Sequence, residues 1–240
     1  MNLFLNFSFL ALIFTAWLPS EVSALNIPEL TAPVMDEAGV IGGRAAQFLD
    51  HLLREANARE KIQLTILTLP SLDGEPIEQA TIKIVDKWKL GKKGKDNGVL
   101  FLVVPAERKA RIEVGQGLEG DLPDVVAKRI LADIARPYFK KGLYADGILA
   151  GTVQILKRAD PEFSIEGYSQ QPSAESKQEQ LPSWAQILIL IALIVIVIFG
   201  RFLGFIGGGF GGGGWGGGSG GGGWSGGGGG FSGGGSSDSW

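Results

Sequence analysis

The chain has 240 residues, of which 45% are hydrophobic, and it carries a formal net charge of −3. This balance gives no basic surface of the kind that binds nucleic acid, so no nucleic-acid partner is expected. The chain has no cysteine and one histidine, which excludes a disulfide framework and the usual zinc sites.

The N-terminal end has the features of a secretion signal. An apolar run extends from Leu3 to Leu18, and Val22 and Ala24 provide small residues at the third-last and last positions before a cleavage site. No lysine or arginine precedes the run, so only the terminal amine supplies positive charge there. We predict a cleaved signal peptide over residues 1–24, with an uncleaved membrane anchor as the alternative.

Residues 25–158 are predicted to form one folded domain. Apolar side chains at helical spacing predict a helix from about Gly43 to Glu60, and the partly alternating segment Ile62 to Leu69 predicts a strand. Pro76 suits the first turn of a second helix, and the continuous apolar run Val99 to Val104 is typical of a strand covered on both faces. Two such strands joined by a helix form a right-handed parallel crossover.

The second half of the domain begins with a hairpin. Polar and apolar residues alternate from Lys109 to Val114, which predicts a half-exposed strand antiparallel to the preceding one. Further helices are predicted at 123–136 and 143–156, separated by Pro137 and Gly142. The expected fold class is α/β, a small sandwich with helices packed on a mixed β-sheet.

Residues 115–120 spell Gly-Gln-Gly-Leu-Glu-Gly, a formal match to the dinucleotide-binding fingerprint. In a nucleotide-binding fold this loop follows a buried parallel strand, and its helix begins within the motif. Here the preceding strand is amphipathic, Pro123 starts the helix after the last glycine, and three acidic residues crowd the place of a pyrophosphate. No nucleotide partner is therefore expected.

Few side chains of the domain suit nucleophilic catalysis. His51 falls between the apolar stripe and the polar face of the first helix, where a half-exposed surface histidine is normal. Ser71 is the only serine between Leu25 and Arg158, and it lies beside Pro70 as a turn residue does. We therefore predict no catalytic residue.

Acidic residues gather near the predicted turns. Asp96-Asn97-Gly98 precedes the buried strand, and three acids surround the glycine loop. Hard divalent cations prefer several carboxylate and carbonyl oxygens, which glycine turns can present. The sequence therefore predicts a Ca²⁺ or Mg²⁺ site, with ordinary turns and a helix cap at Asp121 as the alternatives. The candidate ligands are Asp36, Asp96, Glu113, Glu119, Asp121 and Asp124.

Three segments follow the domain. Residues 159–183, rich in Pro, Ser, Gln and Glu, are predicted to be a linker. Residues 184–206 are mostly apolar and about 20 residues long, which predicts a transmembrane helix. Residues 207–240 are mostly glycine, which predicts a disordered tail whose spaced aromatic residues are either inert or weak contact points. With a signal that directs export, this order predicts a single-pass membrane protein with the domain outside the cytoplasm and the tail inside.

Several stretches of the domain together resemble the TPM domain family, over about Ala32 to Leu156. These stretches occur in the same order as in the family, and their combination is specific to it. In its layout of signal peptide, domain, one span and glycine tail, the chain is also similar to the bacterial branch of the family. The matching stretches are 34–41, 64–72, 88–91, 96–100, 111–120, Pro137 with Phe139, and 144–148.

The resemblance implies a three-layer α/β sandwich that faces outside the cytoplasm. It also implies diverse roles, which are photosystem repair in plants, receptor accessory function in animals and unknown roles in most bacteria. Some members are described as binding calcium and some as weak acid phosphatases. Asp36, Asp96 and Glu119 lie within the matching motifs and are carried over as cation candidates. Gln116 stands where an aromatic residue is common in the family, a departure that concerns the packing of its loop.

The expected function is a membrane-anchored accessory module that binds an unidentified envelope protein, with a divalent cation that rigidifies its acidic loops. The scarcity of histidines and nucleophiles disfavours the alternative, a weak metal-assisted acid phosphatase. A third possibility is an envelope protein whose glycine tail drives assembly.

Overall fold

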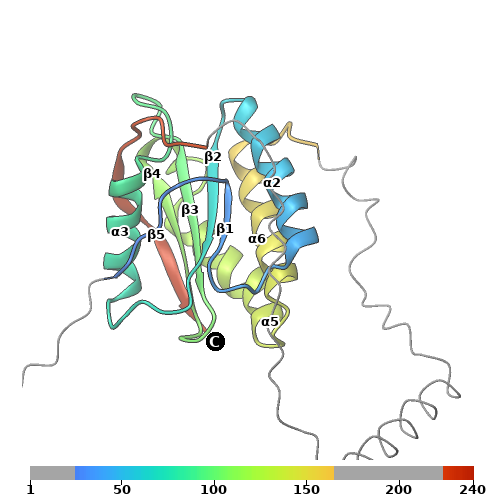
Figure 1. Ribbon diagram of the computed structural model, residues 1–240. Coiled ribbons are helices and arrows are strands. Elements are labelled where there is room, and N and C mark those ends of the chain that lie inside the picture. Colours follow the sequence, from blue (N-terminus) through green and yellow to red (C-terminus); the bar gives the residue numbers. More distant parts are fainter. Residues whose placement is uncertain (1–24, 165–223) are drawn as a thin grey trace, which may run out of the picture. The chain divides into compact units, whose positions relative to one another are not determined.

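The computed structural model describes residues 25–164 and 224–240 (Figure 1). All of these except Ser164 belong to one compact unit. The signal peptide predicted at 1–24, the transmembrane helix predicted at 184–206 and most of the predicted linker lie outside the described residues. Within those residues, no helix is both long enough and apolar enough to cross a membrane.

A five-stranded mixed sheet forms the centre of this unit, with the strand order β1-β2-β3-β4-β5. The strands are β1 (Val34–Asp36), β2 (Gln63–Thr68), β3 (Gly98–Val104), β4 (Lys109–Gly115) and β5 (Phe231–Ser239). The helices are α2 (Gly43–Ala58), α3 (Ile77–Trp88), η1 (Gln116–Leu118), α4 (Asp124–Arg129), η2 (Ile130–Ala135), α5 (Arg136–Phe139) and α6 (Tyr144–Ala159). In Figure 1, α3 lies on one face of the sheet and α2, α5 and α6 lie on the other. The predicted α/β class, with helices packed on a mixed sheet, is confirmed.

The parallel half of the sheet follows from apolar strands connected by helices. β2 pairs in parallel with β1 on one side and β3 on the other. Because side chains alternate along a strand, β3 contributes to the core on both faces of the sheet. Leu100 and Leu102 belong to the cluster beneath α3. Phe101 is fully buried towards α6, where its ring comes within 2.9 Å of the position that a Cβ on Gly151 would take.

The antiparallel hairpin of β3 and β4 is confirmed, but the expected half-exposure of β4 is wrong. Arg111 is 6% exposed and Glu113 is 0% exposed. The two side chains form an ion pair, and each also hydrogen-bonds the Thr81 hydroxyl on α3, so the helix covers this polar face. Alternation of charge with apolar residues therefore marks a buried ion pair here rather than a face open to solvent.

The C-terminal helices continue beyond their predicted ends. The helix expected to stop before Pro137 passes through a π-helical turn, η2, and ends with α5 at Phe139. Proline is tolerated because it lies in the first turn of α5. After α6, Asp160 is buried and accepts hydrogen bonds from Arg59, and Phe163 is buried too. The first residues of the predicted linker therefore pack on the domain.

The prediction of a disordered glycine tail is wrong for residues 224–240. Residues 231–239 form β5, which pairs antiparallel with β4 and completes the sheet. The strand crosses the unit from one end to the other and is drawn in red in Figure 1. The rest of the predicted tail, residues 207–223, lies outside the described residues.

Candidate functional site

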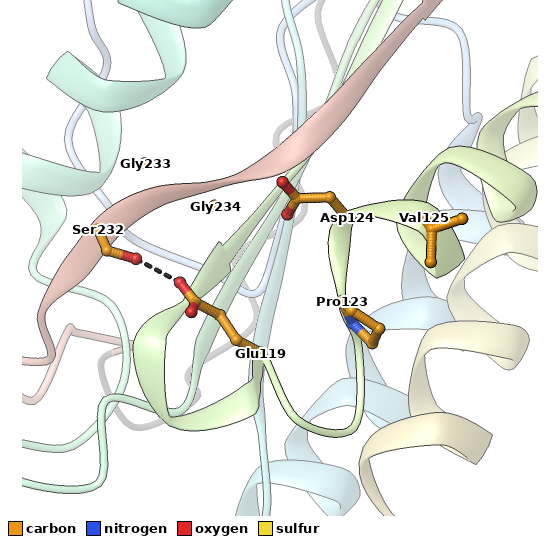
Figure 2. A pocket seen from close by; sticks show the side chains of 7 residues that line it. All are labelled: Glu119, Pro123, Asp124, Val125, Ser232, Gly233 and Gly234. Atoms are coloured by element: carbon orange, nitrogen blue, oxygen red, sulfur yellow. Dashed lines mark hydrogen bonds between the residues drawn. The ribbon is translucent and has the colours of Figure 1, made fainter.

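Three of the six predicted cation ligands hold the C-terminal segment, residues 224–240. Asp96 Oδ1 accepts a hydrogen bond from the Gly230 amide at 2.7 Å. Asp124 Oδ1 accepts one from the Gly235 amide, also at 2.7 Å. Glu119 accepts a hydrogen bond from the hydroxyl of Ser232, as Figure 2 shows. The acidic loops therefore bind main-chain and hydroxyl donors of the C-terminal segment.

The other three predicted ligands lie apart from this segment or beneath it. The Asp36 carboxylate, at the end of β1, accepts hydrogen bonds from the amides of Val40 and Ile41 and from the Thr68 hydroxyl. Glu113 is paired with Arg111 inside the domain. Asp121 is exposed in the turn before α4, and Pro123, not Asp121, stands at the N-cap of that helix. Among the described residues, no group of three or more histidine, cysteine or acidic side chains is placed to hold a metal ion.

The electrostatics of Asp36 and Glu113 differ because their hydrogen-bond partners differ. Burial by itself raises the pKa of the Asp36 carboxyl, but the hydroxyl of Thr68 and the nearby backbone amides together bring it below its ordinary value. Burial also raises the pKa of Glu113, and there the opposing effect of Arg111 and Thr81 does not outweigh it. One oxygen of Glu113, Oε1, is buried with no hydrogen-bond partner.

A shallow depression of about 570 Å³ lies between β5 and the start of α4. Figure 2 shows Glu119 and Asp124 on one side of it and the β5 backbone on the other. Three of its seven lining residues, Ser232, Gly233 and Gly234, belong to the C-terminal segment. This depression therefore has its present shape only while β5 is in place.

The C-terminal segment is anchored at its beginning by Trp224. This side chain is 5% exposed, and its indole N–H donates to the Thr65 hydroxyl at 3.1 Å. The Arg54 guanidinium lies over its ring, 5.7 Å from the centroid. The next residue is held as well, because the Gln63 side-chain amide donates to the Ser225 carbonyl at 2.8 Å.

Glycine is required where the segment passes the loop after α3. A Cβ on Gly226 would lie 1.9 Å from the Trp88 carbonyl oxygen, and one on Gly229 would lie 2.2 Å from that of Leu90. The close approach allows main-chain bonds, among them Gly227 N–H to the Gly91 carbonyl at 2.9 Å. Only a backbone without side chains at these positions fits this passage.

The far end of the segment is anchored by Trp240. Its ring centroid lies 4.7 Å from that of Phe139 and 6.2 Å from that of Tyr144. Its amide donates to the Arg108 carbonyl, and Asp238 pairs with Arg136 at 3.2 Å. A tryptophan therefore fixes the segment at each end.

Neither tryptophan is predicted from the sequence as part of the site. The spacing of aromatic residues in the glycine-rich region was the available signal, and contact points on a spacer were one of its two interpretations. The same reasoning selected Asp96, Glu119 and Asp124 but assigned them a cation. A carboxylate that accepts N–H donors and one that binds Ca²⁺ can have the same local sequence. The sequence around these acids therefore does not determine which of the two they bind.

The described fold agrees with what comparisons with known proteins find. The family model of the TPM domain matches residues 34–158, more than half of the chain. The chain belongs to the TPM domain family. The matched TPM domain contains β1 to β4 and ends within α6, so β5 is an addition to it from the chain's C-terminal segment.

Two solved domains are similar to this TPM domain. The solution NMR structure of the N-terminal domain of a protein from P. gingivalis is 33% identical, with 55% of this chain and 83% of that chain covered and a TM-score of 0.51. The N-terminal domain of the cg2496 protein from Corynebacterium glutamicum is 18% identical. The match covers 60% of this chain and 91% of that chain, with a TM-score of 0.44. No curated protein matches the chain.

Proposed function

We propose that this chain is a membrane-anchored, extracytoplasmic accessory module that binds a partner protein by adding an extended segment of that partner to the edge of β4. The observation that carries this proposal is the occupation of that edge by the chain's own C-terminal segment. An exposed sheet edge offers a row of main-chain donors and acceptors, and peptides bind such edges by joining the sheet as a further strand.

The present occupant has the properties of a replaceable strand. The sequence of β5 is Phe-Ser-Gly-Gly-Gly-Ser-Ser-Asp-Ser, and none of these residues is an aliphatic that would fill the core. Glycine inside a strand weakens it through the entropy of its backbone. Main-chain hydrogen bonds each contribute only about 1 kcal/mol net, so a segment that makes the same bonds and also fills the two tryptophan sites competes on nearly equal terms.

The acidic loops determine the register in which a segment binds along the edge of β4. Asp96, Glu119 and Asp124 accept hydrogen bonds at successive points along the segment, at Gly230, Ser232 and Gly235. Carboxylates bind N–H donors more strongly than neutral acceptors do. An incoming strand that presents donors at the same spacing is held in the same register.

The predicted Ca²⁺ or Mg²⁺ does not fit these residues while β5 is in place. The three carboxylates already accept hydrogen bonds from the segment, and no cluster of three acids is placed for a metal among the described residues. The cation therefore stays a prediction from the sequence, and it takes no part in the proposed binding.

Photo-crosslinking in cells tests the proposal. A photoreactive amino acid replaces Val125, which is 56% exposed beside β5, and a matched variant carries it at the exposed Gln47 on α2. Each is examined with and without the Trp224→Ala and Trp240→Ala substitutions, which release the edge, in cells that also produce the unsubstituted chain. We expect adducts of the chain with a second polypeptide at position 125, increased when the edge is released, and none at position 47.

A released edge that yields no adduct at position 125 contradicts partner binding at β4. The alternative function, a metal-assisted phosphatase, has its own measurement. Turnover of a generic phosphate ester by the purified full chain, dependent on Mg²⁺ or Ca²⁺ and removed by a chelator, favours an enzyme over a binding module.

A further inference from the structure

We propose that two copies of this chain exchange their C-terminal segments, so that residues 224–240 of one copy lie along β4 of the other. This inference rests on the proposed function and names the partner as a second copy of the same chain. Exchange of an identical element preserves every contact that the element makes within one copy, which is why it is a low-cost route to association.

The edge of β4 is selective for the segment that occupies it. The site needs a tryptophan for the Thr65 pocket, and the Gly226 and Gly229 positions admit no side chain. At Gly235 the backbone has a φ of +143°, and a Cβ there would lie 2.3 Å from the Ile112 carbonyl oxygen. A segment that meets all these requirements is rare in composition, and each copy of this chain carries one.

The side chains that anchor the two ends of the segment belong to the segment itself. Trp224 is buried at one end of the groove, and Trp240 packs on Phe139 and Tyr144 at the other. Both anchors belong to residues 224–240, and all the surfaces that receive them belong to residues 25–164. The segment therefore carries both of its anchoring side chains with it, whether it binds to its own copy or to another.

A long stretch of chain lies between the domain and the segment. Residues 165–223 connect Ser164 to Trp224. At no more than about 3.3–3.6 Å per residue, the number of residues in this stretch sets an upper limit on its span well beyond 100 Å, several times the width of a small domain. Its length permits the segment to lie on the neighbouring copy as well as on its own.

The absence of cysteine from the sequence makes a direct test possible. Lys109 of β4 pairs with Ser239 of β5 in the sheet register. The Cα atoms of directly opposed antiparallel residues lie about 4.5–5.5 Å apart, within the range that a disulfide spans. One full-length chain carries Lys109→Cys, a second full-length chain with a different tag carries Ser239→Cys, and the two are mixed and oxidised.

Exchange predicts a disulfide between the two differently tagged copies, with a yield that rises as the chain concentration rises. A third chain that carries both cysteines reports on the pairing within one copy. Adding Gly229→Ala to the Ser239→Cys chain is expected to remove the link between copies. Adding Gly230→Ala is the matched control and should preserve it, because a Cβ at Gly230 meets nothing closer than 3.5 Å.

The proposal is overturned if the doubly substituted chain closes its disulfide while the mixed copies stay unlinked at every concentration. That result leaves the proposed function standing, because the edge at Val125 can still take a segment of a different protein in the photo-crosslinking experiment. If the doubly substituted chain forms no disulfide at all, either within one copy or between copies, the β4–β5 register itself is contradicted, and with it the exchange.

Discussion

The strands β3 and β5 lie in the same sheet, and opposite forces hold them there. β3 reads Gly-Val-Leu-Phe-Leu-Val-Val and is buried along its whole length. β5 contains three consecutive glycines and no aliphatic residue, and along its length it is only partly buried or exposed. Burial of apolar area stabilises β3, at roughly 25 cal/mol per Å². β5 depends on main-chain hydrogen bonds, on acidic side chains of the neighbouring loops and on a tryptophan at each end of its segment.

β3 is placed in the sheet by the apolar residues of its own sequence. β5 is placed there by groups that lie on other parts of the chain. β3 contributes buried side chains to the core of the TPM domain along its whole length. β5 covers an edge that the TPM domain match does not include. Damage to β3 should therefore unfold the whole domain, while damage to β5 should open one edge and leave the domain folded.

The largest effect is expected from Phe101→Ala in β3. Phe101 is fully buried, and truncation of a buried phenylalanine costs about 3–5 kcal/mol through lost burial and the cavity left behind. Denaturant unfolding of the full chain measures the loss. Phe231→Ala in β5 is the matched control and should cost under about 1 kcal/mol, since that ring is only partly buried at the sheet edge. Equal losses at the two positions contradict the comparison.

The next effect concerns the ion pair beneath the edge. Arg111→Met leaves the buried Glu113 without its partner and should lower the free energy of unfolding by about 3 kcal/mol. Replacing both, with Arg111→Met and Glu113→Leu, should recover most of that loss, because no unpaired charge then remains. If the double variant is as unstable as Arg111→Met alone, the ion pair contributes more to the free energy of unfolding than the apolar pair that replaces it.

A smaller and local effect is expected from Trp224→Ala. Loss of a buried side chain of this size weakens docking of the C-terminal segment by about 2 kcal/mol, which corresponds to roughly thirtyfold more undocked segment. Hydrogen exchange should increase in residues 231–239 and along β4, while exchange in β2 and β3 stays unchanged. Faster exchange throughout the sheet shows instead that β5 is integral to the core.

The smallest effect is a pH dependence at Glu78. The Ser237 hydroxyl on β5 donates a hydrogen bond to Glu78 on α3 and lowers the pKa of this carboxyl. A lowered pKa in the docked state stabilises docking above the ordinary value of about 4.3, and this contribution is lost as the pH falls further. The NMR shift of the Ser237 amide should follow this titration, and Glu78→Gln should abolish it. Because Glu78 is exposed, the energy involved is small.

β3 and β5 show which kind of strand can be predicted from the sequence and which kind cannot. A continuous apolar run predicts β3 because burial leaves a local signature in the residues themselves. The buried state of β4 was missed because Arg111 and Glu113 satisfy each other, which a pattern of alternating charge does not reveal. β5 is not predicted because its glycines resemble a disordered tail, and the three carboxylates that hold it lie more than 100 residues earlier in the chain. The acids of the site were identified from their turns, but their ligand depended on that distant segment.

The pairing of β4 with β5 also restricts where the two ends of this protein can reside. Hydrogen-bonded strands share one compartment, so an odd number of membrane crossings between Ser164 and Trp224 is incompatible with the sheet. Whenever β5 is in place, the C-terminus must lie on the same side as the TPM domain, which conflicts with the single-pass topology predicted from the sequence, with the tail inside the cytoplasm. Single cysteines at Asp73 and Ser239, labelled with a membrane-impermeant maleimide on intact cells and after lysis, should react from the same side. Labelling of Ser239→Cys only after lysis, with Asp73→Cys labelled before it, would show that sheet completion and membrane insertion exclude each other in one molecule.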